Sequence, residues 1–333
     1  TTFKIFSDSL YYIVSNMADK EHSKKSGIIG VIDKIGNVKN LVKLGKTNNY
    51  ILSGTKLKNG GFLFVGYNKE NNDEWNQIYV VKTNQEFNII WENSYELLNN
   101  DSKGYAIIEL NDKEYWILGH TKTSKNGALI LKIDGEGNEK WFSYLPNLKC
   151  NFANNMTALS NTEFIISGQN ENQLFVAKID KKGEILWQYN YFDDTKYHRA
   201  YDIKKTNDNA IILVGNSTKT ENHSFDVLMI KLSQDGKEKW VKKFGNEKNE
   251  VARDIKQNKK LEYIISGYAL VDKKEKTYDS FIIKTDSMGN KITRLDFNLM
   301  ASNQLLDLNI EYNEKTNIES YVGAGNIFNE DGK

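Results

Sequence analysis

One sequence phrase returns six times along this chain and constrains its fold more than any other feature. The phrase is an apolar stretch, a polar anchor, a turn that usually contains Gly, and a Trp or a shorter residue seven positions after the anchor. The anchors are 51, 50, 46, 53 and 53 residues apart, at Asp33, Asn84, Asp134, Asp180, Ser233 and Asp286. A period near fifty residues with strand-like content is typical of sheets repeated around an axis.

The fifth repeat shows what each unit is expected to contain. Residues 200–203 predict a first strand, and the apolar run 210–215 predicts a second strand that is covered on both faces. Residues 226–232 and 237–244 predict a third and a fourth strand, separated by a tight turn with Gly. Four antiparallel strands per repeat make one blade, so the sequence predicts an all-β fold, a β-propeller.

The sequence predicts the number of blades less directly. It contains seven segments that are interpreted as the second strand of a blade, but only six complete repeats. Residues 305–310 and 318–322 are interpreted as the first two strands of a seventh blade. We predict one domain over residues 1–333 with seven blades, the last incomplete; a six-bladed propeller with an extra flap is the alternative. The blades are expected approximately at residues 1–45, 46–97, 98–148, 149–194, 195–247, 248–298 and 299–333.

Three columns of residues recur with the repeats and are interpreted as structural. A glycine of the second strand is expected to allow close backbone packing, at Gly66, Gly119, Gly168, Gly215, Gly267 and Gly323. Phe87 stands where the other repeats have a turn glycine, which predicts a turn of different construction. The repeated tryptophans are expected to wedge between adjacent blades rather than form a platform for sugars: Trp91, Trp141, Trp187 and Trp240.

The aspartate-rich turns have a superficial likeness to calcium loops. The turn that begins at Asp134 lacks the twelve-residue spacing to a bidentate Glu that such a loop needs. Asp and Asn before Gly are ordinary turn formers. We therefore interpret these segments as hairpin turns without a metal ion.

Composition excludes several classes of function. The formal net charge is +1, and only three of the 45 basic residues are arginines, so nucleic-acid binding is disfavoured. No apolar run is long enough to span a membrane. Cys150 is the only cysteine, and the four histidines lack a metal-binding spacing: His22, His120, His198 and His223. With no phosphate loop or nucleophile motif present, we predict no cofactor and no metal.

Two segments carry a resemblance to a known group of proteins. Residues 131–141 and 178–187 each run from an apolar strand with Lys-Ile-Asp through a turn glycine to Trp. This phrase resembles the β-propeller repeats of bacterial extracytoplasmic proteins, including the pyrroloquinoline-quinone-type propellers, over nearly the whole chain. The quinone enzymes of that group use a vicinal disulfide and metal ligands, and a single cysteine is incompatible with that disulfide.

The location of the protein is an expectation from the same features. The sequence begins at Thr1 rather than Met, which we interpret as a removed leader. If that leader was a secretion signal or a lipid anchor, the protein works outside the cytoplasm, as a secreted protein or a cell-surface lipoprotein.

A further column lies thirteen residues before the second-strand glycines. First strands line the channel of a propeller, so this column predicts a partly acidic channel ring. The ring consists of Ser53, Asn155, Asp202, Asp254 and Asp307, with Arg199 and Arg253 close to the carboxylates in sequence. It could hold a cation, or each Asp could accept hydrogen bonds from backbone amides of its own or the next blade, and we favour the second interpretation. The two arginines are expected to pair with the carboxylates.

Long polar segments are expected on one face, where binding residues usually lie on loops held by a rigid scaffold. They span residues 16–26, 67–76, 216–225 and 268–280. Aromatic and histidine side chains in or near them predict a binding surface: Tyr67, Trp75, Tyr197, His198, Tyr268 and Tyr278. Ordinary solvated loops would have a similar composition.

Two functions from different classes follow from these sites. We predict a non-catalytic propeller that binds a protein or a surface glycan outside the cytoplasm. The alternative is a carbohydrate-directed enzyme that uses acidic residues at the mouth of the channel for acid–base chemistry.

Overall fold

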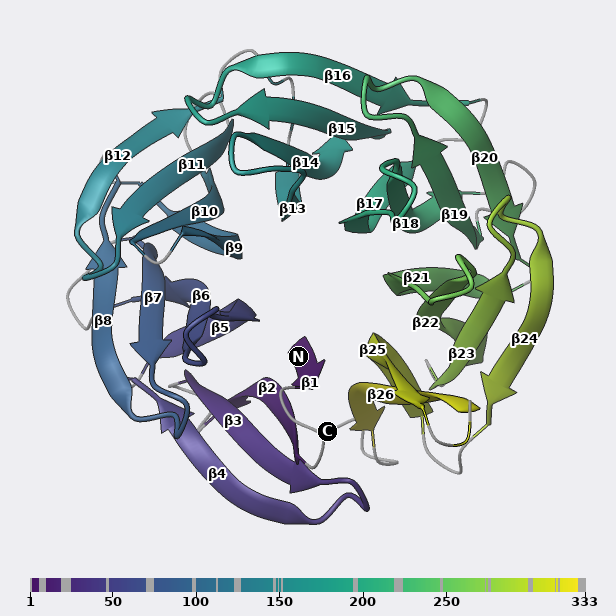
Figure 1. Cartoon of the computed structure of the whole chain (residues 1–333), viewed down its shortest axis with the longest axis horizontal. Helices are drawn as coiled ribbons and strands as arrows, with labels where there is room; N and C mark the ends of the chain where they lie inside the picture. The colour runs from purple at the N-terminus through teal and green to yellow at the C-terminus, as the bar shows by residue number, and fades with distance from the viewer. Residues whose placement is uncertain are drawn as a thin grey trace. The chain divides into compact units, whose positions relative to one another are not determined.

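Antiparallel strands in sequence order build the sheets of this protein (Figure 1). The structure is a computed structural model, and it describes residues 2–5, 10–18, 25–45, 48–69, 75–97, 100–111, 113–122, 127–145, 148, 150, 152–193, 197–218, 224–245, 248–272, 274, 277–298, 302–314, 316 and 318–328. Within these ranges every helix or strand is a β-strand. The all-β prediction is therefore confirmed.

Each four-stranded sheet contains four consecutive strands joined by hairpins. The first three sheets are β1 (Thr2–Ile5), β2 (Leu10–Ala18), β3 (Lys25–Asp33), β4 (Val38–Leu44); β5 (Asn49–Lys56), β6 (Phe62–Asn68), β7 (Gln77–Thr83), β8 (Ile89–Tyr95); and β9 (Ser102–Asn111), β10 (Glu114–Thr121), β11 (Gly127–Asp134), β12 (Glu139–Tyr144). The next three are β13 (Phe152–Ala158), β14 (Glu163–Asn170), β15 (Gln173–Asp180), β16 (Ile185–Tyr191); β17 (His198–Lys205), β18 (Ile211–Thr218), β19 (Phe225–Leu232), β20 (Glu238–Phe244); and β21 (Asn249–Gln257), β22 (Tyr263–Asp272), β23 (Thr277–Thr285), β24 (Lys291–Phe297).

The number of blades is six, and the prediction of seven is wrong. Among the described residues there are six four-stranded sheets, and the seventh repeat adds only the two-stranded sheet of β25 (Ser302–Asn313) and β26 (Ile318–Phe328). Leu308 of this pair is buried against Ile264 and Ile282 of the preceding blade. Packing on that blade therefore covers the apolar side of the hairpin without a second pair of strands. The fold is a six-bladed β-propeller.

The chain divides into two compact units, one of Thr1–Ile166 with Lys178–Leu186 and the other of Ser167–Ala177 with Trp187–Lys333. In the first, apolar residues of β6 and β7 form one core with those of β10 and β11. In the second, the sheet of β17 to β20 packs in the same way on that of β21 to β24 (Figure 1). Every residue of β18 is buried, as expected for a strand covered on both faces, whereas β20 is partly exposed.

The turn at Phe87 is built like the glycine turns, so the prediction of a different turn is wrong. Asn84 N donates to Asn88 O at 3.0 Å and Phe87 N donates to Asn84 O at 3.2 Å, the pattern also seen after Asp134. Phe87 adopts a φ of 64°, which costs a residue with a side chain about 1–2 kcal/mol. Its ring is buried and stacks on Phe62 with centroids 4.6 Å apart. Burial of the ring offsets the backbone strain.

The repeated tryptophans wedge against the hairpin turn of the following blade, which confirms their structural interpretation. Trp187 Nε1 donates to Gln234 O at 3.1 Å, and a Cβ added to Gly236 would lie 2.8 Å from the indole ring. Trp91 Nε1 makes the same bond to Gly135 O at 3.0 Å. The turn glycine therefore supplies a positive φ, 82° at Gly236, and also leaves room for the ring.

The aspartate-rich turns are ordinary hairpin turns, as interpreted from the sequence. Asp134 Oδ1 accepts hydrogen bonds from Glu136 N at 3.1 Å and from Asn138 N at 2.7 Å. The carboxylate is thus engaged with the backbone of its own turn.

Candidate functional site

A β-bulge in the first strand of the blades determines where the candidate residues lie. In β17 the pairing passes from Ala200↔Gly215 directly to Asp202↔Val214, which leaves Tyr201 as the extra residue. The same shift occurs in β5, β9, β21 and β25. The channel-ring column, which was defined as thirteen residues before the second-strand glycines, is therefore the position that directly follows the bulge.

The bulge also shows that one of the predicted second-strand glycines was assigned wrongly. In the seventh repeat Leu305 pairs with Gly325, and Asp307 pairs with Ala324 after the shift. A Cβ on Gly325 would lie 1.7 Å from Gln304 O, as one on Gly215 would lie 1.8 Å from Arg199 O. Gly325, rather than the predicted Gly323, is thus the packing glycine, and Asp307 occupies the same register position as Asp202 and Asp254.

The buried carboxylates of this column tie consecutive first strands together. Asp202 Oδ2 accepts a hydrogen bond from Ile255 N of β21 at 3.2 Å. Asp254 Oδ2 accepts one from Leu308 N of β25 at 3.0 Å. These are the bonds that the second interpretation of the column expects, from backbone amides of the next repeat.

Lysines neutralise these carboxylates. Lys204 Nζ lies 2.5 Å from Asp202 Oδ1, and Lys256 Nζ lies 2.6 Å from Asp254 Oδ2 and 3.6 Å from Asp307 Oδ1. The cations that the structure pairs with Asp202 and Asp254 are therefore lysines, where the sequence suggested arginines. Since Asp202 and Asp254 are only 7% and 5% exposed, each ion pair stabilises a charge that would otherwise be buried alone.

The pKa values of the two aspartates move in opposite directions. Burial raises the pKa of Asp202 to about 6, and the nearby Asp254 adds to this effect against the attraction of Lys204. Burial would also raise the pKa of Asp254, but the ammonium groups of Lys256 and Lys204 outweigh it and hold that pKa well below its usual range. The ammonium groups of Lys204 and Lys256 therefore balance the negative charge of this pair.

Within the second unit, Asp254 and Asp307 of the proposed channel ring lie near the same lysine, Lys256. Asp202, Asp254 and Asp307 lie in the second unit, whereas Ser53 and Asn155 belong to the first. Among the described residues, no group of three or more His, Cys, Asp or Glu side chains is placed to hold a metal ion.

The two arginines of the candidate set both contact the ring of one tyrosine. Arg199 Cζ lies 5.0 Å from the centre of the Tyr201 ring, and Arg253 Cζ lies 4.7 Å from it. The rings of Tyr268 and Tyr278 meet edge to face nearby, with centroids 5.4 Å apart. We call these five residues the arginine–tyrosine cluster.

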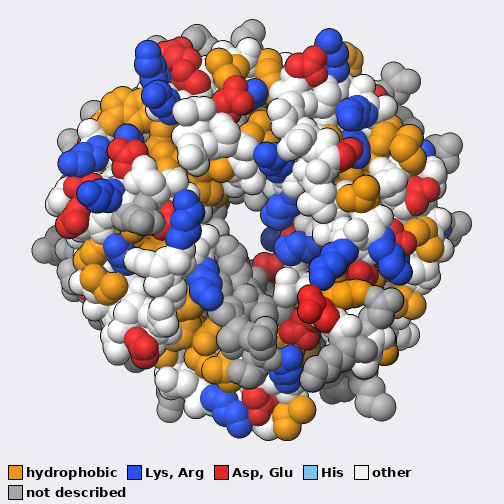
Figure 2. All heavy atoms as spheres, in the orientation of Figure 1, with side chains coloured by type: hydrophobic (Ala, Val, Ile, Leu, Met, Phe, Trp, Pro, Cys, Tyr) orange, Lys and Arg blue, Asp and Glu red, His pale blue; other side chains and the backbone are white. Residues whose placement is uncertain are grey.

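The bulges place this cluster on neighbouring strands. Tyr201 and Arg253 are the extra residues of the bulges in β17 and β21, and a bulge re-aims its side chain out of the regular ladder. Figure 2 shows Lys and Arg side chains gathered over these first strands. Burial raises the pKa of Tyr268, and the nearby Arg253 partly opposes this rise.

The cluster has the chemistry of an anion-binding surface. Its two guanidinium groups carry planar sets of N–H donors. Arg253 Nε is buried, and no acceptor for it occurs among the described residues. Tyrosine rings beside these donors add contact area at low entropic cost.

The other predicted binding residues have contacts of their own. Tyr67 and Trp75 belong to the first unit, where Tyr67 stacks on Tyr50 with centroids 5.3 Å apart and Lys103 Nζ lies 4.5 Å from the Tyr67 ring centre. Trp75 is 38% exposed. Tyr197 Oη donates to Gln169 Oε1 at 2.9 Å.

His198 is a buried structural residue. It is 1% exposed, its Nε2 lies 3.1 Å from Asp193 Oδ1, and its ring meets Tyr191 edge to face at 5.0 Å. Burial lowers the pKa of His198 more strongly than Asp193 raises it. A buried imidazole offers no surface for a partner.

Parts of the predicted long loops lie in strands. Residues 16–18, 216–218 and 268–272 extend β2, β18 and β22. The central parts of these predicted segments lie outside the described residues, at 19–24, 70–74, 219–223, 273 and 275–276, which include His22 and His223.

Sequence reasoning missed Tyr201, the residue at the centre of the cluster. The signal that could have found it is its place directly before the Asp202 column, where the other bulged strands carry Leu52, Tyr105, Arg253 and Leu306. Without the bulge, alternation in a regular strand would assign Tyr201 and Asp202 to opposite faces and give no reason to consider them together.

Comparison with known proteins gives no family for this chain. No protein-family model matches the sequence, and no curated protein matches it. Solved structures that are similar include the β-propeller domain of the Trilobed protease from Pyrococcus furiosus, with 11% identity, a TM-score of 0.48, and coverage of 78% of this chain and 74% of that domain.

Two further similar structures are larger proteins. One is a prolyl endopeptidase, with 12% identity, a TM-score of 0.48, and coverage of 94% of this chain and 46% of that one. The other is the extracellular domain of a putative hybrid two-component system from B. thetaiotaomicron, with 12% identity, a TM-score of 0.45, and coverage of 93% and 43%. This chain spans less than half the length of either. Similarity at this level transfers no activity.

In the part of the chain that the structure describes, no helix is long and apolar enough to cross a membrane.

Proposed function

We propose that this protein is a non-catalytic β-propeller that binds an anionic group of a protein or glycan partner through the arginine–tyrosine cluster. The observation that supports this function is that two of the chain's three arginines place their guanidinium groups within 5.0 Å of the centre of the Tyr201 ring. Carboxylate, sulfate and phosphate groups match the fork of N–H donors of a guanidinium group.

The carboxylates favour binding over catalysis. A general acid or base must reach a substrate, and a hydrolytic pair usually faces an open cleft. Asp202 and Asp254 are buried and bound to lysines and backbone amides. We therefore prefer the binding function to the carbohydrate-directed enzyme.

We also propose that the protein works outside the cytoplasm, secreted or at the cell surface. This part of the proposal is supported by the resemblance of the repeat phrase to extracytoplasmic propellers. Fractionation of cells that express the natural full-length protein, followed by immunodetection, tests it, and recovery only with cytoplasmic markers would contradict it.

A glycan and peptide array tests the binding function. The array carries sulfated, sialylated and uronate-containing glycans, their neutral counterparts, and acidic and neutral peptides. We expect the wild type to bind a subset of the acidic members and Arg253→Gln to lose at least about tenfold in affinity for them, since charge-assisted hydrogen bonds are lost.

Trp75→Ala is the matched control because it removes an exposed aromatic residue of the first unit. It should bind like the wild type. Equal binding by the wild type and Arg253→Gln, or binding of neutral members alone, would refute the choice of this cluster.

A further inference from the structure

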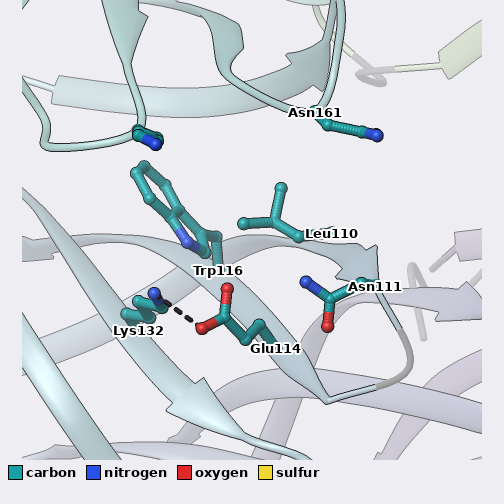
Figure 3. Close-up of a pocket in the computed structure, with 7 residues that line it drawn as sticks. Leu110, Asn111, Glu114, Trp116, Lys132 and Asn161 are labelled. Atoms are coloured by element: carbon teal, nitrogen blue, oxygen red, sulfur yellow. Dashed lines mark ion pairs between the residues drawn. The ribbon is translucent and has the colours of Figure 1, made fainter.

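A small pocket lies in the first unit. Its volume is about 140 Å³, and it is formed by the β9–β10 hairpin, β11 and turns of the following repeat (Figure 3). The residues that line it are Leu110, Asn111, Glu114, Trp116, Lys132, Asn161 and Lys181. A pocket of this size can hold a molecule of several heavy atoms but not a drug-sized ligand.

Trp116 is an exception to the composition of its column. It lies three residues before Gly119, and the same position is aliphatic in four other repeats, at Leu63, Ile165, Ile212 and Ile264, whereas the first repeat has Tyr12 there. Trp116 and the four aliphatic side chains are at most 1% exposed. Four blades therefore pack this position with an aliphatic side chain and without a polar atom, so the core of a blade does not require an indole here.

The indole N–H of Trp116 has no acceptor in the part of the chain that the structure describes. Trp116 is fully buried, and no hydrogen-bond partner for its Nε1 occurs among the described residues. Figure 3 shows this nitrogen on the side of the ring that faces the Glu114 carboxylate and the Lys132 ammonium group. A buried N–H without a partner costs about 1–3 kcal/mol, so an acceptor supplied by a ligand would stabilise it.

The packing of the ring limits the kind of ligand. One neighbour, Phe164, stacks on Trp116 with centroids 4.6 Å apart, and Trp141 lies against it at 6.1 Å. With these rings packed on it, Trp116 offers the ligand its N–H edge rather than a face for sugar stacking. The pocket therefore requires a hydrogen-bond acceptor.

The charges of the pocket favour an anion. Lys132 Nζ and Glu114 Oε1 form an ion pair of 2.8 Å, and equivalent pairs recur between Lys178 and Glu163 and between Lys284 and Glu262. This pair belongs to the framework of the blades. The ammonium group of Lys181 adds a net positive charge, and the Asn111 and Asn161 amides add polar groups.

From these observations we propose that the pocket at Trp116 binds a small carboxylate. One carboxylate oxygen accepts the hydrogen bond from Trp116 Nε1, Lys181 neutralises the charge, and a short apolar part of the ligand contacts Leu110. The carboxylate belongs either to a free small acid or to an acidic side chain of a peptide.

Two-dimensional NMR of the indole N–H groups tests the proposal directly, because the chain has six tryptophans. The Trp116 cross-peak is assigned by its loss in Trp116→Phe. We titrate the wild type with acetate, succinate, a short glutamate-rich peptide, phosphate, and chloride at matched ionic strength. We expect a saturable shift of the Trp116 cross-peak with acetate or succinate, while the Trp75 cross-peak stays unchanged.

Lys181→Ala is the second variant, since it removes an ammonium group at a surface turn and should leave the fold intact. It is expected to raise the Kd of the carboxylate about 3- to 10-fold. A shift with the peptide alone would assign the site to a protein carboxylate. A shift with phosphate but with neither carboxylate nor peptide, a shift equal to that with chloride, or no effect of Lys181→Ala would overturn the proposal.

Discussion

Removal of the Trp187 wedge tests the packing on which the fold depends. A fully buried Trp removes about 150–250 Å² from water, and Trp187 is partly buried, so we take about 100–160 Å². At about 25 cal/mol per Å² this burial contributes at most about 2.5–4 kcal/mol. The hydrogen bond to Gln234 O adds about 0.5–1 kcal/mol. The two contributions together are at most about 3–5 kcal/mol, and because the burial figure is an upper bound we expect Trp187→Ala to lower the free energy of unfolding by about 2–4 kcal/mol.

The assay is urea denaturation followed by far-UV circular dichroism, which does not depend on the tryptophan removed. With an m-value near 3 kcal/mol/M, the midpoint should fall by about 1 M. Trp187→Phe keeps part of the ring but loses the N–H, and should fall in between. Trp75→Ala is the control, since it removes an exposed Trp and should change stability by less than about 0.5 kcal/mol. Equal midpoints for Trp187→Ala and Trp75→Ala would refute the wedge.

Three further predictions concern the turns and the buried acids. Gly236→Ala should lower the free energy of unfolding by about 1–3 kcal/mol, because the new Cβ meets the Trp187 ring and alanine is strained at a φ of 82°. In the double mutant with Trp187→Ala the clash is removed, so the two destabilisations should sum to more than the double mutant loses. Strictly additive changes would contradict the contact. Phe87→Gly should be less destabilising than Phe87→Ala by about 1 kcal/mol in urea denaturation, since only glycine adopts the φ of 64° without strain; the reverse order would contradict the backbone argument. The pKa of Asp202 is about 6 in the folded state, above its ordinary value of 3.8, so the folded protein binds this proton more tightly than the unfolded chain does. The stabilisation that this proton provides is complete below pH 4 and is lost as the pH rises through 6. In Asp202→Asn the free energy of unfolding should not show this pH-dependent decrease of about 2–3 kcal/mol. If the free energy of unfolding has the same pH dependence in the wild type and in Asp202→Asn, burial does not raise the pKa of Asp202.

Much of the fold was predictable because its signals are local. Strand, turn and period are properties of neighbouring residues, and so the fifth repeat has its four strands where the apolar runs and turn formers predict them. The Trp wedge was predictable for the same reason, since a residue repeated once in each blade meets the same surroundings in each. Phe87 was misinterpreted because its ring is buried by Tyr12 and Phe62, which are distant in sequence.

The candidate sites were less predictable, because their geometry depends on one extra residue in a strand. The spacing to the glycines found Asp202, Asp254 and Asp307, and it could not reveal that a bulge turns Tyr201 and Arg253 out beside them. The direction of each side chain determines whether a lysine or an arginine reaches a given carboxylate. This direction alternates along a strand and changes at a bulge.

The sequence by itself determined the class of fold, the length of the repeat and the chemistry of each turn, because hydrophobic period and backbone preference act over a few residues. Only the tertiary structure decided that six blades are complete, that lysines neutralise the buried acids, and that Trp116 directs its N–H into a pocket. The contacts that determine burial and electrostatics join residues of different repeats, about fifty positions apart, so no local pattern records them.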